Sequence, residues 1–142
     1  MKSLDRLTIA RKFILQTPFA ESLRMQAEVA AEGMVVISMA YDKNLADDIV
    51  NGLLHGGAIA ALIDMSAGLS FLLHPTNPVD VATLDLRIDT LRPPMPRQKV
   101  TATAVCYHVA GSVGFVRVSA TDQDINNPIA TAVGTFSFRL ID

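Results

Sequence analysis

The spacing of the hydrophobic positions changes along the first third of the chain. Residues 3–16 place apolar side chains three or four positions apart, which predicts a short amphipathic helix that ends before Pro18. Over residues 23–31 apolar and polar residues alternate, and after a Glu-Gly pair the chain continues as an apolar run over residues 34–41. Two such runs on either side of a glycine turn predict a β-hairpin.

The rest of the chain combines one helical pattern with several extended ones. Residues 42–50 have no clear period and predict a loop, whereas residues 58–73 are apolar on every side of a 3.6-residue spiral and predict a helix buried all round. After breakers at residues 74–78, strands are predicted over residues 79–91, 99–109, 113–121 and 129–140. We therefore expect an α+β fold, a single domain spanning residues 1–142, in which a curled antiparallel sheet surrounds the long helix.

Asp64 stands out within the predicted central helix. It is the only Asp, Glu, Lys or Arg between Asp48 and Asp80. An ionised carboxylate in an apolar helix costs several kcal/mol unless it is hydrogen-bonded, paired or open to a cavity. A structural carboxylate that accepts backbone hydrogen bonds is one explanation of Asp64, and a functional carboxylate is the favoured one.

Composition excludes several classes of protein. Half of the residues are hydrophobic, and 12 basic against 14 acidic residues give a net charge of -2, which argues against nucleic-acid binding. The apolar part of the central helix is too short to span a membrane and is broken by polar residues and Asp64. Cys106 is the only cysteine and the N-terminal charges interrupt any signal peptide, so we expect a cytoplasmic protein. His74 and His108 have no second ligand at metal spacing, so we expect no metal.

A second feature lies at the start of the predicted helix, in the run His55-Gly56-Gly57. The first N–H groups of a helix lack intrahelical acceptors and can polarise an acyl carbonyl, although two glycines also suit a simple tight turn. Asp64 comes nine positions after His55, which places it on the opposite side of the helix and roughly 13 Å along the axis. If both residues serve one site, two subunits must share it, and a two-fold homodimer follows.

The run from Gly52 to Gly57, followed by Ala60 and Asp64, resembles the signature of hotdog-fold acyl-CoA thioesterases of the phenylacetyl-CoA thioesterase-like branch. The segment from Thr83 to Pro93 and the order of the later strands resemble the same family. The resemblance implies a hotdog fold, in which an antiparallel sheet wraps a long helix, and dimers that often pair into tetramers. It also implies that coenzyme A enters only as part of the substrate, with no other cofactor.

The resemblance assigns roles residue by residue. Asp64 would act as general base on water or as nucleophile on the thioester, and the Gly56 N–H would bind the thioester oxygen. His55 would orient the loop or help bind the carbonyl, although a histidine there can simply satisfy backbone groups. Thr83 would hold the lytic water, although its register calls for a bulge. Many relatives have an asparagine where this chain has Ile49, and Asn51 is the candidate to replace it.

The expected substrate follows from the residues around Asp64. Gly57, Met65 and Leu69 are expected to line an apolar pocket, which favours medium-chain or aromatic acyl-CoAs. The nearest cations for the coenzyme A phosphates are Arg92, Arg97 and Lys99, which surround a proline-rich loop. Two other functions remain open, a hotdog 3-hydroxyacyl-thioester dehydratase or hydratase and a non-catalytic acyl-thioester-binding module.

Overall fold

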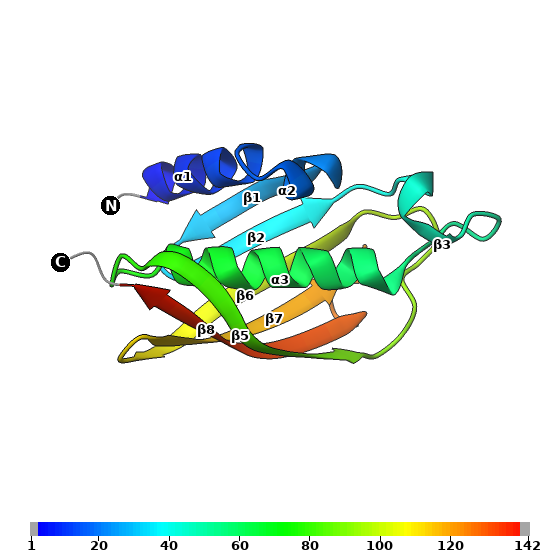
Figure 1. Ribbon diagram of the computed structural model, residues 1–142. Helices are drawn as coiled ribbons and strands as arrows, with labels where there is room; N and C mark the ends of the chain where they lie inside the picture. Colours follow the sequence, from blue (N-terminus) through cyan, green and yellow to red (C-terminus); the bar gives the residue numbers. More distant parts are fainter. Residues whose placement is uncertain (1–2, 140–142) are drawn as a thin grey trace.

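The computed structural model describes residues 3–139 of the chain (Figure 1). The helices are α1 (Ser3–Leu15), α2 (Pro18–Ser22) and α3 (Gly56–Leu72), with a 3₁₀ turn, η1 (Lys43–Leu45), between α2 and α3. The strands are β1 (Met25–Ala31), β2 (Met34–Met39), β3 (Ala46–Asp48), β4 (Leu53–Leu54), β5 (Val79–Thr90), β6 (Val100–Ala110), β7 (Val113–Thr121) and β8 (Ala130–Arg139).

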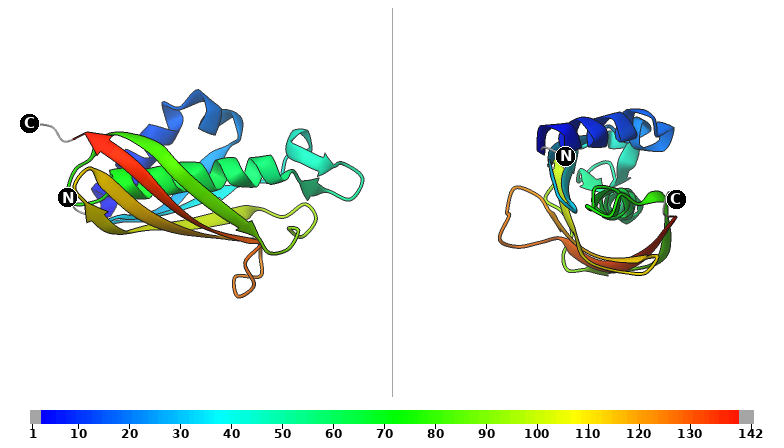
Figure 2. Two further views of the ribbon diagram at one scale, coloured as in Figure 1. Left: turned by 60° about the horizontal axis from the view of Figure 1, so that its bottom comes forward. Right: turned by 90° about the vertical axis from the view of Figure 1, so that its left-hand side faces the viewer.

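Six of these strands form one sheet in the order β1-β2-β6-β7-β8-β5, and every neighbouring pair is antiparallel. The view along α3 shows the sheet curving around one side of that helix (Figure 2). This arrangement confirms the predicted hotdog fold, with a short N-terminal helix packed over β1.

Alternation along the strands explains why the sheet packs on α3. Every second residue from Val100 to Cys106 and from Gly114 to Ala120 is buried, and these side chains face the helix. The helix supplies Phe71, which is fully buried and meets Phe138 edge-to-face at a centroid distance of 5.0 Å. A Cβ at Gly114 would lie 2.7 Å from the Phe71 ring, so this close approach of strand and helix requires glycine.

The central helix differs from the prediction in two respects. It begins at Gly56, two residues earlier than the apolar pattern indicated. It is also not buried all round, because Asp64 is exposed and Ala60, Ala61, Met65 and Gly68 are only partly buried in the single chain. Apolar and small residues on this side of α3 looked like core in the sequence, yet the sheet does not cover them.

Four short elements went unpredicted, namely α2, η1, β3 and β4. Pro18 ends the first helix as expected, but it also starts α2, because proline is well suited to the first turn of a helix. The segment predicted as a loop contains η1 and β3, and β3 pairs with β4 in a separate two-stranded sheet. Elements this short carry too few residues to show a period. The predicted end of the last strand, Leu140, lies outside the described residues.

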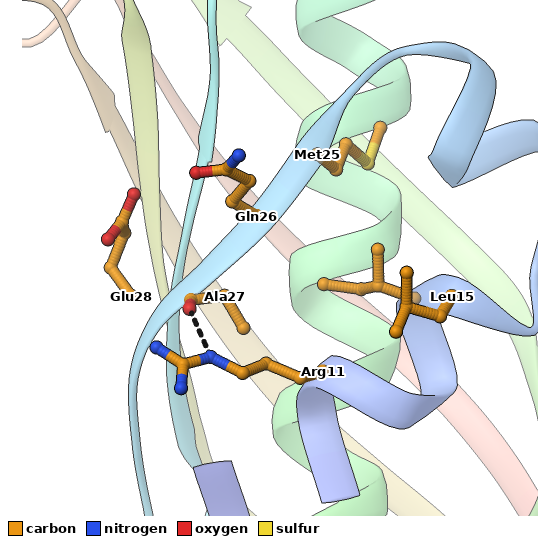
Figure 3. A pocket seen from close by; sticks show the side chains of 7 residues that line it. Arg11, Leu15, Met25, Gln26, Ala27 and Glu28 are labelled. Carbon is orange, nitrogen blue, oxygen red and sulfur yellow. Dashed lines mark hydrogen bonds between the residues drawn. The ribbon is translucent and has the colours of Figure 1, made fainter. Parts of the chain in front are cut away.

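The two edges of the main sheet are different. At the β1 edge, α1 packs over the strand, and Arg11 Nε donates a hydrogen bond of 3.4 Å to the carbonyl oxygen of Ala27 (Figure 3). At the other edge, β5 pairs only with β8 among the strands in residues 3–139. β5 is twelve residues long, so it leaves a long row of backbone groups for a further strand.

Candidate active site

Asp64 and Thr83 lie together although 19 positions separate them in the sequence. The hydroxyl of Thr83 donates a hydrogen bond of 2.8 Å to Asp64 Oδ1. Asp64 comes from the middle of α3 and Thr83 from the first half of β5. The register of β5 against β8 shifts between Thr83 and Asp85, which is the irregularity that the sequence required if Thr83 was to face the helix.

Asp64 and Thr83 both line a pocket of about 340 Å³. The predicted Met65 and Leu69 line it, but Gly57 does not. The remaining lining comes from the C-terminal half of α3, the start of β5, the end of α1, the corner between α1 and α2, and β8: Phe13, Thr17, Gly68, Leu72, Asp80, Val81 and Phe136. Most of these side chains are apolar, so the carboxylate of Asp64 sits at the edge of a hydrophobic cavity.

The start of α3 is organised by His55. Its backbone is extended and its Nδ1 accepts a hydrogen bond of 2.8 Å from the N–H of Gly57, so His55 is the N-cap of the helix. A Cβ at Gly57 would lie 2.9 Å from this Nδ1, so the cap needs glycine at that position. His55 Nε2 lies 4.0 Å from Asp47 Oδ1 on the exposed side. His55 therefore caps the helix by satisfying a backbone N–H, and its role in orienting the loop for a substrate stays a prediction.

Gly56 occupies the first position of α3, where its N–H has no intrahelical acceptor. A Cβ built on it would meet nothing within 4 Å, so the backbone is open to a ligand. Gly56 lines a second pocket of about 200 Å³ together with Ile88 and Thr90 near the end of β5 and with Arg92 and Pro93. Asp64 and Gly56 thus lie in different pockets of one chain, as the helix geometry predicts.

Asn51 closes a turn. Its backbone N–H donates to Asp48 Oδ1 at 3.1 Å, and its side-chain amide donates to Asp48 Oδ2. These contacts, the backbone one first, lower the pKa of the Asp48 carboxyl. The amide of Asn51 is therefore directed to Asp48 within its own turn, and the structure does not bring it to the Asp64–Thr83 pair.

The three cations differ in their surroundings. Arg92 forms a double hydrogen bond with the buried carboxylate of Asp122, both distances being 2.8 Å, so it has a structural partner that the sequence did not reveal. Arg97 Nη2 donates to the Val50 carbonyl at 2.9 Å. Lys99 is exposed. Only Arg92 lines a pocket together with Gly56.

The sequence reasoning missed Phe13 and Asp80, both of which line the Asp64 pocket. Phe13 had one signal, because it is a large aromatic residue just beside the buried stripe of an amphipathic helix. Asp80 adopts a positive φ of 51°, and this backbone conformation cannot be inferred from a sequence at a residue other than glycine. Within residues 3–139 no three His, Cys, Asp or Glu side chains are grouped to hold a metal ion.

Fold and site together define an α+β hotdog protein with a carboxylate–hydroxyl pair over an apolar pocket. The sequence profile of the Thioesterase superfamily matches residues 51–129, which include His55, Gly56, Asp64 and Thr83. The chain belongs to the Thioesterase superfamily, and the predicted thioesterase activity class is confirmed at this level. In the part of the chain that the structure covers, no helix is long and apolar enough to cross a membrane.

The chain is similar to three further proteins over most of its length. It is 26% identical over 141 residues to the Escherichia coli medium/long-chain acyl-CoA thioesterase YigI, covering 90% of each chain. It is similar to a Pseudomonas aeruginosa protein of known crystal structure, with 33% identity, a TM-score of 0.85 and coverage of 95% and 99%. A variant of the phenylacetic acid degradation protein PaaI from Thermus thermophilus is 28% identical, with a TM-score of 0.71 and coverage of 87% and 99%.

Proposed function

We propose that this protein hydrolyses acyl-CoA thioesters with medium-chain or aromatic acyl groups to the free acid and coenzyme A. The observation that carries the proposal is the 2.8 Å hydrogen bond from Thr83 to Asp64 at the mouth of an apolar pocket. The relative YigI is named for medium/long-chain acyl-CoA substrates, and PaaI for phenylacetic acid degradation. Both names fit a hydrophobic acyl pocket.

The chemistry follows from the hydrogen-bond pattern. Because Thr83 donates to Oδ1, the carboxylate is held in one orientation and its second oxygen can take a proton from water. The resulting hydroxide adds to the thioester carbonyl, the oxyanion is stabilised by a backbone N–H, and the coenzyme A thiolate leaves. We assign the N–H of Gly56 as this donor, because it has no hydrogen-bond acceptor within the helix.

A homodimer supplies this donor from the second subunit. The β5 edge can pair antiparallel with the same strand of a copy around a two-fold axis near the middle of the strand. The first half of β5 then lies opposite the second half of the partner's β5. The Asp64 pocket borders the first half, at Val81 and Thr83, and the Gly56 pocket borders the second half, at Ile88 and Thr90. Two equivalent composite sites result, and two such dimers can pair into a tetramer.

Coenzyme A binding is assigned to the positive groups near the Gly56 pocket. Arg97 and Lys99 are exposed, whereas Arg92 reaches the pocket while paired with Asp122. We propose that the adenosine phosphates meet these side chains outside the acyl pocket. The free, buried Cys106, whose pKa is raised by burial, fits a reducing compartment, and we propose a cytoplasmic location.

Replacing the carboxylate tests the proposal. Asp64→Asn keeps the shape of the side chain but removes the base, so we expect kcat for octanoyl-CoA to fall by roughly 10²-fold or more. Thr83→Val should also lower kcat, whereas Thr83→Ser keeps the hydroxyl and serves as the matched control. The measurement is thiol release from a panel of acyl-CoAs, with circular dichroism to confirm folding. Unchanged turnover in Asp64→Asn, or hydration of an enoyl-CoA without thiol release by the wild type, would contradict the assignment.

A further inference from the structure

The N-terminal helix carries an aromatic side chain that lies outside its buried stripe. α1 packs on β1 through a stripe of buried residues spaced four apart, Arg6, Ala10 and Ile14. Phe13 lies beside this stripe, with 39% of its surface exposed. Its ring lines the Asp64 pocket across from residues of α3 and β5. A large exposed aromatic residue at the wall of an apolar pocket is available to a ligand.

The backbone around Phe13 is held in place. The hydroxyl of Thr17 donates a hydrogen bond of 2.8 Å to the carbonyl of Phe13, and the N–H of Thr17 donates to the carbonyl of Ile14 at 3.1 Å. Pro18 starts α2 immediately afterwards and fixes the direction of the chain. The corner between α1 and α2 therefore presents the ring from a rigid position, and Thr17 itself lines the same pocket.

We propose that Phe13 is a specificity-determining residue that contacts the acyl chain of the substrate. This inference rests on the proposed function and deepens it, because it names the side chain that contacts the acyl group and so sets the preferred length and shape of that group. The pocket follows α3 from Asp64 to Leu72, which corresponds to about 12 Å along the helix axis. An acyl group that extends along this path lies between Met65 and Leu69 on one side and the Phe13 ring on the other.

Such a wall selects for acyl groups long enough or flat enough to contact it. Loss of one such contact in a hydrophobic pocket changes discrimination by roughly 10-fold or more. Phe13→Ala should therefore lower the ratio of kcat/KM for octanoyl-CoA to that for acetyl-CoA about tenfold, and Phe13→Leu should retain most of the ratio. The matched control is Ile9→Ala, one turn earlier on the same side of α1, since Ile9 is 37% exposed and does not line the pocket.

A binding measurement separates this inference from the catalytic proposal. In an Asp64→Asn background, titration calorimetry should show octanoyl-CoA binding about tenfold more weakly when Phe13→Ala is added and unchanged when Ile9→Ala is added. Equal effects of the two alanine substitutions, an unchanged acyl ratio, or loss of the dimer in light scattering for Phe13→Ala would overturn the inference. If the wild type binds octanoyl-CoA in this Phe13-dependent way but releases no thiol, the proposed hydrolysis fails and the inference stands.

Discussion

At the scale of single residues, one hydrogen bond decides how Asp64 is presented. The residue belongs to an exposed strip of α3, so water reaches the carboxylate in the single chain. The Thr83 hydroxyl restricts its rotation by binding Oδ1. An exposed aspartate without such a partner would sample several rotamers, and a base that must meet one water in one position benefits from the restriction.

A second carboxylate, Asp122, has a purely structural setting. Its side chain is fully buried, and the Arg92 guanidinium holds the pKa of its carboxyl well below the usual range. The backbone N–H groups of Met95 and Asp124 also donate to it, at 3.0 and 3.1 Å. The Arg92 pair therefore joins the loop after β5 to the turn after β7.

Asp122→Asn should lower the melting temperature at pH 7 by about 5 °C or more, because Arg92 loses its counter-charge. A carboxyl whose pKa is depressed in the folded protein contributes stability above its unfolded pKa of about 4, and the contribution is lost as pH falls through the folded value. The difference between wild type and variant should hence shrink towards pH 3. Calorimetry at both pH values checks this. Asp124→Asn, which changes an exposed carboxylate two positions later, is the control, and an equal difference at both pH values would refute the ion-pair explanation.

At the scale of elements, the first two N–H groups of α3 differ in their hydrogen-bond partners. His55 caps the helix through the Gly57 N–H, whereas the Gly56 N–H has no acceptor within the helix. The N–H of Gly57 is therefore occupied by the cap, whereas the N–H of Gly56 is open to the carbonyl oxygen that we propose. A substitution at Gly56 can therefore remove the proposed oxyanion donor and leave the His55 cap intact.

Gly56→Pro should lower kcat by roughly 10²- to 10³-fold, because it deletes the assigned oxyanion donor. Proline is tolerated at the first helical position, and the φ of −65° and ψ of 138° at His55 already match the residue before a proline. Gly56→Ala is the matched control, since it keeps the N–H and its Cβ would meet nothing within 4 Å. Thiol-release kinetics decide the point. Equal activity of the proline and alanine variants would exclude Gly56 as the donor.

At the scale of the whole molecule, two pockets that never meet in one chain border opposite halves of β5. The other edge of the sheet, β1, is covered by α1 and Arg11 (Figure 3). The sheet can therefore be extended at β5 more readily than at β1. This asymmetry supports the proposed dimer through β5 and its shared site.

Subunit complementation tests the shared site. Asp64→Asn and Gly56→Pro chains are each expected to be nearly inactive, but a hybrid dimer has one site with both defects and one site with neither. Refolding an equal mixture should thus restore about a quarter of the wild-type activity, provided that chains pair at random. Light scattering establishes the dimer. A mixture no more active than the average of the two variants would show that both residues act within one chain, or in different reactions.

The sequence by itself determined the long elements of the fold and the class of chemistry. Alternation located the long strands of the sheet, the apolar run located α3, and the isolated charge of Asp64 singled out the carboxylate that we propose as the base. These features are local, because each depends on the character of neighbouring residues along the chain. Short elements such as α2 and β3 were not predicted, because they contain too few residues to establish a period.

Only the tertiary structure decided which side of α3 stays open and what lies against it. Phe13, Asp64 and Thr83 come from three elements, and no local pattern shows that they border one pocket. The partner of Arg92 is 30 positions away, at Asp122. Such contacts depend on strand order and on one shift of register between Thr83 and Asp85, and both are set by the packing of the whole sheet.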